Sequence, residues 1–559
     1  MALLRSESPN VTVKEIDLSG SIPGVTSTTA AFVGDFAWGP TTPVLVGTEE
    51  ELVSKFGSPR DGGDAKDFLA ITQFLKYSGS AFVTRAAGTG AEAATGGIFT
   101  AKHVGTYGNL ISVHVCDSAH WADTTSATVT VTTNVQATDA EGDLLFEQMQ
   151  QPVVDEDGNG VVDADGNPVM ETVDDPTKPI YETETVDAST DGWQFASLFT
   201  SAPDSDERHI VVTVDGDVVE TYAYVKLTSS FDGVTGESQT ITEAMRGSSW
   251  VSVTESPSTI ATGENALSGG ENGTAVKASV ALNSAYGDKD LIQVDFLVAH
   301  NVSKEDLSDV VAIAERRMDC VVVASPDVAP TSASDVTGWA SAQPSSSYLI
   351  MDGNHVQVYN KYSDQYEMIP ACSTTAGIMA ASDDASAPWF SPAGTRRGQY
   401  FGVSALSFNP TMSDRDLMYK ARVNPIVSMP GQGTVLFGDK TALSRPSAFD
   451  RINVRRMFLV IERAIGEAAK SVLFELNDDF TRAEFTNIVE PFLREIQGRR
   501  GITDFRVVCD ETNNTAEVVD RNQFIASCFI KPARSINYVT LNFVAVRSGV
   551  EFEEVVGQV

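Results

Sequence analysis

The sequence predicts a multidomain protein of mixed class, with an α/β domain, a C-terminal α+β domain, an inserted all-β domain and two strand-like arms. Three patterns predict this class. Helix-like and strand-like segments alternate near the start and again after residue 286. A long stretch of short alternating segments separates these two parts, and a single strand-like segment lies at each end. The 559 residues allow roughly three or four domains.

The first arm is expected to comprise residues 1–22. Apolar and polar residues alternate within 9–19, before a Pro-Gly turn at Pro23 and Gly24. Because one strand is not stable by itself, this segment must pair with another. The residues expected to make that contact are Val11, Val13, Ile16 and Leu18.

The α/β domain is expected to comprise residues 23–88 and 286–390. Thr48 and Glu51 form a capping-box pattern that predicts a helix start. Further helices are predicted over Asp64–Ser78 and over Ser303–Arg317, the latter with Ser303 as its N-cap. The predicted strands are Thr28–Gly34, Ala81–Ala86, Leu291–Val298 and Asp319–Ala324.

The inserted all-β domain is expected to comprise residues 89–285. Thr, Val, Asp, Glu and Gly dominate this stretch, which is typical of short antiparallel strands. An Asp-Gly pair at Asp215 and Gly216 predicts a hairpin turn. The predicted strands are Ala127–Thr133, Ile210–Val214 and Val218–Leu227.

The C-terminal domain is expected to comprise residues 391–547, after a Pro- and Gly-rich connector at Pro388–Gly398. Long amphipathic patterns predict helices over Asp450–Ser471 and Thr481–Gln497. The predicted strands are Ala516–Asp520, Asp504–Asp510, Phe524–Lys531 and Ile536–Arg547. Residues 548–559 form the second arm, with its apolar contacts at Val550, Phe552 and Val555.

The charge excludes several classes of function. There are 39 Lys and Arg against 76 Asp and Glu, a net charge of −37. This sign argues against binding to nucleic acid or to an anionic membrane surface. The charge is uneven: the part from Ser391 onward is nearly neutral, and the excess is densest between Ala91 and Val280. Two regions of the chain are therefore expected to face different surroundings.

Cysteine usage and hydropathy indicate the compartment in which the chain folds. The five cysteines form no C-x-x-C pair and no regular framework, so we expect folding in a reducing compartment. The first residues lack the apolar run of a signal peptide. No stretch reaches the roughly 20 apolar residues of a membrane span, and direct membrane insertion is not expected.

An acidic segment resembles half of a calcium loop. Asp155, Asp157 and Asn159 occupy the first ligand positions, and Asp163 would be the ninth. The twelfth position is Gly166 instead of a bidentate Glu. Acidic hairpin turns are the favoured interpretation, so no metal site is expected.

Two further motifs are weaker. Gly433–Thr441 is one residue away from a phosphate-binding loop, but Asp439 stands where the lysine belongs and displaces Lys440. His114, Cys116 and His120 lie close in sequence without a further metal ligand. A Gly-rich turn and a packed strand face are the favoured interpretations, and we expect no catalytic group and no cofactor.

Basic residues cluster at the ends of the two C-terminal helices. One interpretation is ordinary helix-end charge and internal ion pairs. The other is a patch that docks on an acidic partner surface. The candidate residues are Arg451, Arg455, Arg456, Arg494, Arg499 and Arg500.

The C-terminal sequence resembles the tail sheath proteins of contractile-tailed bacteriophages. The matching runs include SAFDRINVRRMF (447–458), LFELNDDFTRAEF (473–485), RRGITDFRVVCDETNNT (499–515) and IKPARSINYVTLNFVAVRSGVEFEEVVG (530–557). Upstream runs are PGVTSTTAAFVGDFAWGP (23–40), SSSYLIMDGNHVQVYNKYSDQYEMIP (345–370) and PWFSPAGTRRGQY (388–400). The acidic insertion matches least.

The resemblance implies a structural protein of the virion tail, assembled in the host cytoplasm, and not an enzyme. Subunits would stack as helical rings, expected to be hexameric, around a tail tube protein, together with baseplate and tail terminator proteins. The arms would add strands to sheets of neighbouring copies, and contraction would drive the tube through the host envelope for genome delivery. The near-neutral C-terminal domain would face the tube, at the six arginines named above, and the acidic insertion would face outward.

Three rival functions remain open at this stage. The chain could be the sheath of another contractile injection system, such as a bacteriocin-like particle or a secretion machine. It could be a nucleotide-using motor that depends on Gly433–Thr441, or a host-binding surface protein that depends on the insertion.

Overall fold

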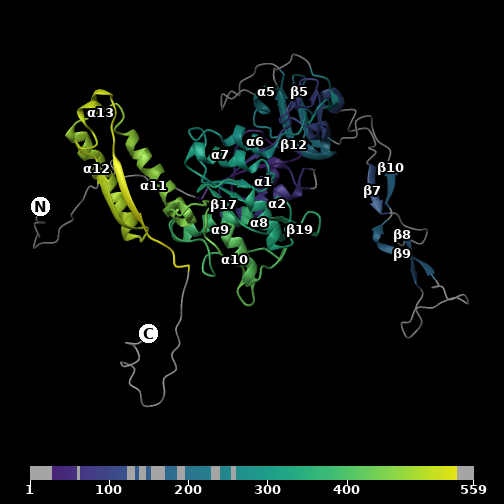
Figure 1. Cartoon of the computed structure of the whole chain (residues 1–559). Helices are drawn as coiled ribbons and strands as arrows, with labels where there is room; N and C mark the ends of the chain where they lie inside the picture. Colours follow the sequence, from purple (N-terminus) through teal and green to yellow (C-terminus); the bar gives the residue numbers. More distant parts are fainter. Residues whose placement is uncertain are drawn as a thin grey trace, which may run out of the picture. The chain divides into compact units, whose positions relative to one another are not determined.

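The computed structural model describes residues 28–59, 63–121, 132–136, 146–152, 170–179, 181–185, 195–227, 240–253 and 260–537. Both predicted arms, with their seven contact residues, and the acidic Asp155–Asp163 motif lie outside these ranges, and so does most of the predicted strands Ala127–Thr133 and Ile536–Arg547. The chain divides into two compact units (Figure 1), one of Met1–Ala87 with Ala275–Val559 and one of Gly88–Thr274.

A six-stranded sheet forms the centre of the first unit. Its strand order is β17-β16-β15-β1-β3-β2, and every neighbouring pair is parallel except β2 with β3. The strands are β1 (Ala30–Gly34), β2 (Val44–Val46), β3 (Ala81–Arg85), β15 (Phe296–Ala299), β16 (Val321–Ala324) and β17 (Leu349–Met351). This order requires helical crossovers, which cover both faces of the sheet.

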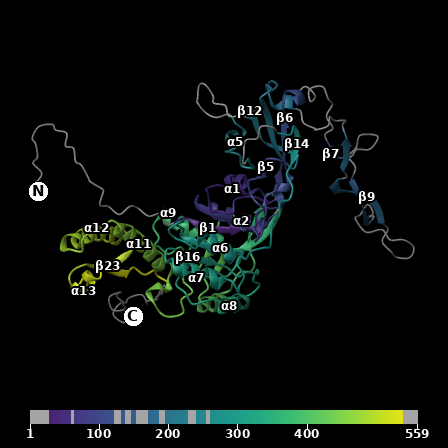
Figure 2. The ribbon, with the colours of Figure 1, turned by 90° about the horizontal axis from the view of Figure 1, so that it is seen from above.

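The alternation of side chains along β1 divides the core between two faces. Ala31 and Val33 pack in one buried cluster with α6 (Ala278–Tyr286), α7 (Leu307–Arg317) and α8 (Ala333–Ser341). Ala30 and Phe32 pack in another. The helices of that second cluster, several of which are labelled in Figure 2, are α1 (Glu49–Phe56), α2 (Ala65–Leu75), α9 (Cys372–Ala385) and α11 (Ile452–Lys470).

A smaller antiparallel layer follows in the sequence. β18 (His355–Asn360) pairs with both β19 (Gln365–Pro370) and β20 (Ala405–Leu406). After α10 (Met412–Lys420), β21 (Ile426–Met429) and β22 (Gly433–Leu436) form a hairpin. Val356, Val358, Ile426 and Leu436 share one buried cluster, which joins these strands.

The C-terminal part has a helical layer against a hairpin. After the 3-10 turn Ala448–Asp450, α11 is followed by α12 (Asp479–Gly498), β23 (Ile502–Val508), α13 (Ala516–Asp520) and β24 (Ser527–Pro532). Met457 and Ile461 of α11, with Val489 and Leu493 of α12, form its buried cluster. Since Ile452 and Leu459 pack against the central sheet, α11 belongs to two cores.

The second unit contains antiparallel sheets. The central one has the order β12-β11-β6-β14, from β6 (Ile111–Cys116), β11 (Glu207–Val214), β12 (Asp217–Lys226) and β14 (Gly263–Ala266). The remaining elements are β4 (Thr95–Gly96), β5 (Phe99–Ala101), the 3-10 helix Thr106–Leu110, β7 (Thr132–Gln136), β8 (Phe146–Pro152), β9 (Met170–Pro179), β10 (Tyr181–Thr185), α4 (Phe195–Leu198), α5 (Ile241–Ala244) and β13 (Val251–Val253). At the predicted hairpin, Asp215 and Gly216 both have positive φ, as a two-residue turn requires.

Three sequence predictions are corrected. Ala516–Asp520 is the helix α13 and not a strand, because Thr515 takes the extended N-cap geometry and Glu517 lies in the first turn. The strand predicted from Leu291 begins only at Phe296, and Leu291 is 81% exposed. The helix predicted from Ser303 begins only at Leu307, although the Ser303 hydroxyl accepts from the N–H of Asp306 at 3.3 Å and so caps the turn that precedes the helix.

The helix α6 also differs from expectation. The sequence pattern predicts that most of it lies in the inserted region, but it belongs to the first unit and its Tyr286 hydroxyl donates to the carbonyl of Phe32 in β1. The mixed α/β class is confirmed. None of the described helices is long and apolar enough to cross a membrane.

Candidate functional site

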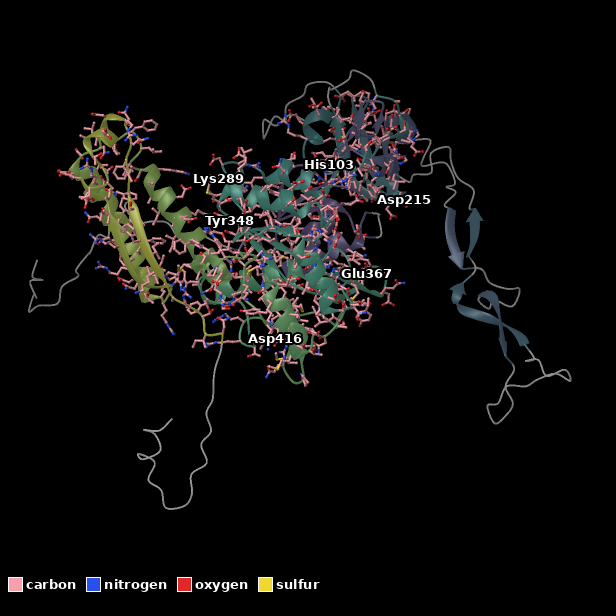
Figure 3. All side chains as sticks on the ribbon, in the orientation of Figure 1. His103, Asp215, Lys289, Tyr348, Glu367 and Asp416 are labelled. Carbon is pink, nitrogen blue, oxygen red and sulfur yellow. The ribbon has the colours of Figure 1, made fainter. Side chains whose placement is uncertain are left out.

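Two of the candidate arginines are buried inside the chain. Arg456 forms an ion pair with Asp383 of α9 and stacks on Phe296, with its guanidinium carbon 4.7 Å from the ring centre. Arg455 pairs with Glu462 at 3.0 Å and stacks on Tyr348, which Figure 3 labels. Their side chains are only 5% and 6% exposed. Both are therefore corrected from docking residues to internal ion pairs.

Arg451 belongs to a cluster around Asp439. Its guanidinium donates to the Asp439 carboxylate at 2.9 Å, and Asp439 is 2% exposed. Ser391 donates to the same carboxylate at 3.1 Å. Ser535 and Asn537, just beyond β24, donate to it at 2.8 and 2.9 Å. These hydrogen bonds hold Ser535 and Asn537 in place after β24. The Arg451 side chain is therefore also occupied by contacts within the chain.

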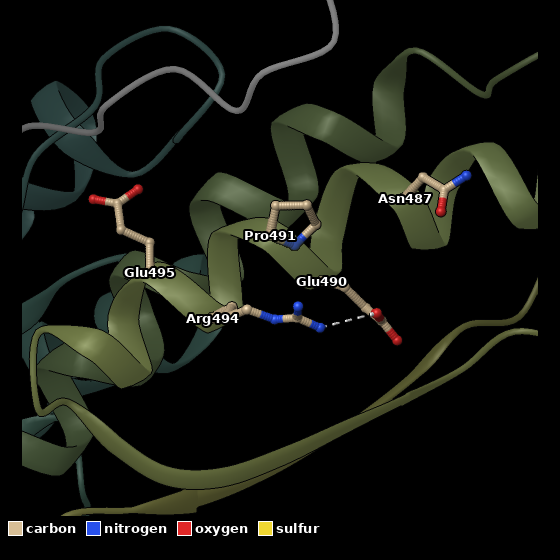
Figure 4. Close-up of a pocket in the computed structure, with 5 residues that line it drawn as sticks. All are labelled: Asn487, Glu490, Pro491, Arg494 and Glu495. Atoms are coloured by element: carbon tan, nitrogen blue, oxygen red, sulfur yellow. Dashed lines mark ion pairs between the residues drawn. The ribbon is translucent and has the colours of Figure 1, made fainter. Parts of the chain in front are cut away.

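Arg494 and Arg499 lie on the surface of α12. Arg494 is 72% exposed and lies 3.8 Å from Glu490, one turn earlier. Figure 4 marks this ion pair with a dashed line. Arg499 is 53% exposed and lies 3.5 Å from Glu495. Exposed pairs of this kind contribute little to stability. Because the Arg499 guanidinium also donates to the Ser386 carbonyl at 3.3 Å and stacks on Trp389 at 5.0 Å, only the Arg494 guanidinium is available to a partner at small cost.

Pro491 lies inside the same helix, which continues beyond it to Gly498. Proline has no N–H, so it cannot donate to the carbonyl of Asn487 one turn earlier. A depression of about 420 Å³ lies beside it, lined by Asn487, Glu490, Pro491, Arg494 and Glu495 (Figure 4). The polar side chains of one helix face form its walls, and no deep pocket results.

Arg500 follows the end of α12 in the left-handed conformation, with φ of 69°. The N–H of Gly501 donates back to the carbonyl of Ile496 at 2.9 Å, as at other helix ends of this kind. Glycine is the usual residue at such a position. Arg500 lines a cavity together with Gln497 and Arg534.

Among the described residues, β23 and β24 form a two-stranded sheet. Phe505 and Val507 of β23 and Ile530 of β24 face the core below, whereas Phe529 is 62% exposed on the other side. Within the described residues each strand has a single strand partner, so each has an edge without one. Such edges can accept a strand from another chain.

The sequence pattern predicts these two strands but not that each has an edge without a partner among the described residues. The alternation of apolar residues predicts that one face is buried. It contains no information about which edges remain open, because edge pairing depends on segments far away in the chain.

The loop at Gly433–Thr441 lacks the geometry of a phosphate-binding loop. Lys440 lies 3.8 Å from the ring centre of Tyr419 and donates to the Tyr419 carbonyl at 2.9 Å. The next α-helix, α11, begins only at Ile452. A phosphate-binding loop instead leads directly into a helix N-terminus.

The His and Cys residues of β6 lie in packed surroundings. His114 lies 3.3 Å from the hydroxyl of Thr213, and Cys116 belongs to a buried cluster with Phe195 and Val211. Across the described part of the chain, no group of three or more His, Cys, Asp or Glu side chains could hold a metal ion.

Two buried carboxyl groups lie at the carboxyl end of the central sheet. Asp67 accepts from the N–H of Asp35 and from Asn301, and His300 lies 3.2 Å away. Asp352 accepts from Ser325 at 2.5 Å and from Thr375 at 2.7 Å. Their partners are internal, so these groups position strand ends and helices.

Within the part of the chain that the structure describes, the arrangement is that of a structural subunit with unpartnered sheet edges and a charged helix surface. Comparisons with known proteins agree. The phage tail sheath protein central domain matches residues 274–442, and the phage tail sheath C-terminal domain matches residues 444–545. The tail sheath protein of Vibrio phage KVP40 is 31% identical over 98% of this chain and 99% of that protein.

Two other comparisons extend this result. The tail sheath protein of Salmonella phage ViI is 32% identical over 98% of each chain. The crystal structure of a sheath tail protein from Listeria innocua has the same fold, with a TM-score of 0.53 and 13% identity over 92% of this chain and 97% of that one. The chain therefore belongs to the tail sheath protein family of contractile-tailed bacteriophages.

Proposed function

We propose that this chain polymerises helically around a tail tube and that contraction of the polymer drives the tube through the host envelope for genome delivery. Family membership over the whole chain supports this function. Assembly would occur in the host cytoplasm, with baseplate and tail terminator proteins at the two ends of the polymer. Hexameric rings are the expected repeating layer.

The open edges of β23 and β24 are the single observation that carries the assembly mechanism. Each edge is a row of backbone groups without a strand partner among the described residues. Residues 1–22 and 548–559 each contain one strand-like pattern that needs a partner. We infer that these arms add strands to the β23–β24 sheet of neighbouring copies, through Val11, Val13, Ile16, Leu18, Val550, Phe552 and Val555.

Deletion of residues 1–19 tests strand addition. The truncated chain should give the same circular dichroism spectrum as the full chain and remain monomeric, whereas the full chain should form striated tubes in negative-stain micrographs. A matched pair of variants sharpens the test. Val11→Asp with Val13→Asp should abolish tubes, whereas Thr12→Asp with Lys14→Asp, on the opposite face of the same strand, should preserve them. Tubes formed by the truncated chain would contradict strand addition.

The surface arginines at the end of α12 are the proposed tube contact. Arg494 and Arg499 are exposed, and Arg500 follows them. Arg494→Glu with Arg499→Glu should still allow tubes of sheath alone, but should give loose or prematurely contracted sheath on purified tail tubes. Arg521→Glu, on α13, is the control. Extended sheath of normal appearance with the double variant would exclude these two residues as tube contacts.

We also propose the remaining domain roles. The C-terminal domain would face the tube, and the acidic inserted domain, residues 89–285, would face outward and keep the particle soluble through its negative charge. Limited proteolysis of assembled tubes tests this arrangement, because cleavage should occur first in the inserted domain.

A further inference from the structure

A cavity of about 940 Å³ lies in the first unit, beside the point where the described chain ends. Its walls come from the connector after α9, from α10, from the segment after β22, from the end of α12 and from the residues after β24. Ser535, Ile536 and Asn537 form one side of it. Asp416, labelled on α10 in Figure 3, lies on another side.

The cavity is basic. Five arginines line it against two aspartates, Asp416 and Asp439. Asp439 is already committed to Arg451 and to three neutral donors. The ion pairs of the described residues include none of the five guanidinium groups. The five are Arg396, Arg397, Arg415, Arg500 and Arg534.

Several of these arginines are held at a cost. Arg500 has the left-handed backbone that glycine adopts more easily. The Nε of Arg415 is buried and has no hydrogen-bond partner among the described residues. The pKa of Arg397 is lowered from its ordinary value, first by desolvation and then by repulsion from Arg396. An anion in the cavity would offset each of these costs except the backbone strain.

The walls also contain aromatic surface. Arg397 stacks on Phe390 at 5.0 Å and Arg415 on Phe437 at 5.2 Å. Phe437 is still 46% exposed. The cavity therefore suits a peptide that combines carboxylates with apolar side chains.

The chain itself contains such a peptide. Residues 549–555 read Gly-Val-Glu-Phe-Glu-Glu-Val, and they include three glutamates and no basic residue. In an extended chain Glu551 and Glu553 share one face, and Val550 and Phe552 share the other. The segment is thus complementary to the cavity in charge and in apolar character.

We propose that the arginine-lined cavity binds the acidic C-terminal segment, Glu551–Glu554, of a second copy of this chain. This inference rests on the proposed self-assembly and adds the contact that fixes the register of the incoming arm. A cavity and a complementary segment on one molecule make a head-to-tail contact, which generates open helical polymers. If the segment bound the cavity of its own chain, neither the segment nor the cavity would be available to a neighbouring copy.

Two charge-reversal variants, tested alone and mixed, distinguish between the possible occupants of the cavity. Variant A carries Arg396→Glu and Arg534→Glu, both on exposed side chains, and variant B carries Glu551→Arg and Glu553→Arg. Each variant alone should form at least tenfold less polymer than wild type by sedimentation. An equimolar mixture should recover tubes, because the basic cavity of B accepts the acidic segment of A and the acidic cavity of A accepts the basic segment of B.

The other outcomes contradict the proposal. If only the chain with all four substitutions forms tubes and the mixture does not, then the segment occupies the cavity of its own chain. If variant A alone forms tubes normally, then the cavity has no part in assembly. If variant A assembles alone but fails to mount on purified tail tubes, then the tube is the occupant. Arg445→Glu with Arg521→Glu changes the net charge equally, outside the cavity, and should leave assembly unchanged.

A binding measurement separates this inference from the proposed function. A synthetic peptide of residues 546–557 should bind full-length variant B, whose own segment is basic, and should bind at least tenfold more weakly when Arg396→Glu and Arg534→Glu are added. If the peptide binds but the wild-type chain forms no tubes, the proposed helical polymer is contradicted and the proposed occupant of the cavity is not. If the wild-type chain forms tubes but the peptide does not bind, only the proposed occupant of the cavity is contradicted.

Discussion

Buried charged residues join segments that are far apart in the sequence. Asp439 holds the residues after β24, and Asp383 of α9 holds Arg456 of α11. Asp295, at the start of β15, pairs with Arg463 at 2.7 Å. Removing one member of such a pair leaves an uncompensated charge in the interior. These residues fix the C-terminal layer to the central sheet. Because their charges are neutralised inside the chain, the presence of charge does not identify them as a docking surface.

Asp352 should make the first unit less stable as the pH rises. Burial raises the pKa of its carboxyl to about 7, although hydrogen bonds from Ser325 and Thr375 oppose this shift. Above the unfolded pKa of 3.8 the folded chain keeps a proton that the unfolded chain has released. The free energy of unfolding should therefore fall with rising pH up to about 7, by at most about 1.4 kcal/mol per pH unit.

Urea unfolding between pH 5.5 and 7.5 measures this effect. Asp352→Asn cannot ionise, so the difference in unfolding free energy between wild type and variant should change with pH in the stated direction. Asp384→Asn, on the exposed side of α9, is the matched control and should give a constant difference. A constant difference for Asp352→Asn as well would show that the carboxyl does not titrate in this range.

His209 should give the opposite pH dependence in the second unit. It is fully buried, donates from Nε2 to the carbonyl of Ser201, and accepts at Nδ1 from the N–H of Tyr224. Desolvation lowers the pKa of its imidazole below the ordinary 6.5. Because the unfolded chain then binds the proton more readily, stability is complete above pH 6.5 and is lost as the pH falls below it.

The variant His209→Gln checks this prediction. It should be less stable than wild type at pH 8 by about 1–3 kcal/mol, because it loses buried hydrogen bonds and the stacking on Phe199 at 4.1 Å. Thermal unfolding at pH 8 and pH 5.5 should show a smaller loss for the variant than for wild type on acidification. An equal loss in both would exclude His209 as the responsible group.

Local signals define several elements in this chain. Thr48 caps α1 and accepts from the N–H of Glu51, as predicted. The Glu51 carboxylate accepts from Gly47 instead of Thr48, so the reciprocal half of the capping box is displaced by one residue. The strand β1 is buried at all five positions, as expected for a central parallel strand. Caps and continuous apolar runs are thus reliable here because they depend on neighbours in sequence.

The cap of α8 should contribute measurably to stability. Ser332 accepts from the N–H of Asp335 at 3.3 Å, and the Asp335 carboxylate accepts from the N–H of Ser332 at 3.0 Å. Ser332→Ala should lower the free energy of unfolding by about 1 kcal/mol, as measured in urea. Ser334→Ala, inside the same helix and exposed, should change it by less than about 0.5 kcal/mol. Equal effects of the two substitutions would contradict a capping role.

The molecule as a whole contains two units with separate cores. The first has the doubly covered sheet and its C-terminal layer, and the second has the sheets around β6 and β11. Units that have their own buried cores commonly unfold separately. The net charge of −37 is concentrated in the second unit, where it is suited to solubility instead of packing.

Calorimetry of the full chain with Val11→Asp and Val13→Asp, kept monomeric, should resolve two unfolding transitions. Asp352→Asn should shift one of them and His209→Gln the other, because the two residues belong to different units. A single transition, or a shift of the same transition by both variants, would show that the units unfold as one.

Long specific motifs and local periodicity were sufficient to predict the family, the mixed fold class, the long helices and the buried strands. They could not distinguish buried arginines from surface ones. Arg455 and Arg456 have the same local pattern as exposed helix-end cations, and only α9 and the central sheet, distant in sequence, bury them.

The tertiary structure also decided the state of short segments and of sheet edges. Ala516–Asp520 has the residues of a strand but becomes a helix, because five residues carry little intrinsic preference and their surroundings decide. The pairing of β23 with β24 and the arginine-lined cavity arise from segments that lie far apart in the sequence. Contacts of this kind depend on long-range packing, which local sequence patterns do not encode.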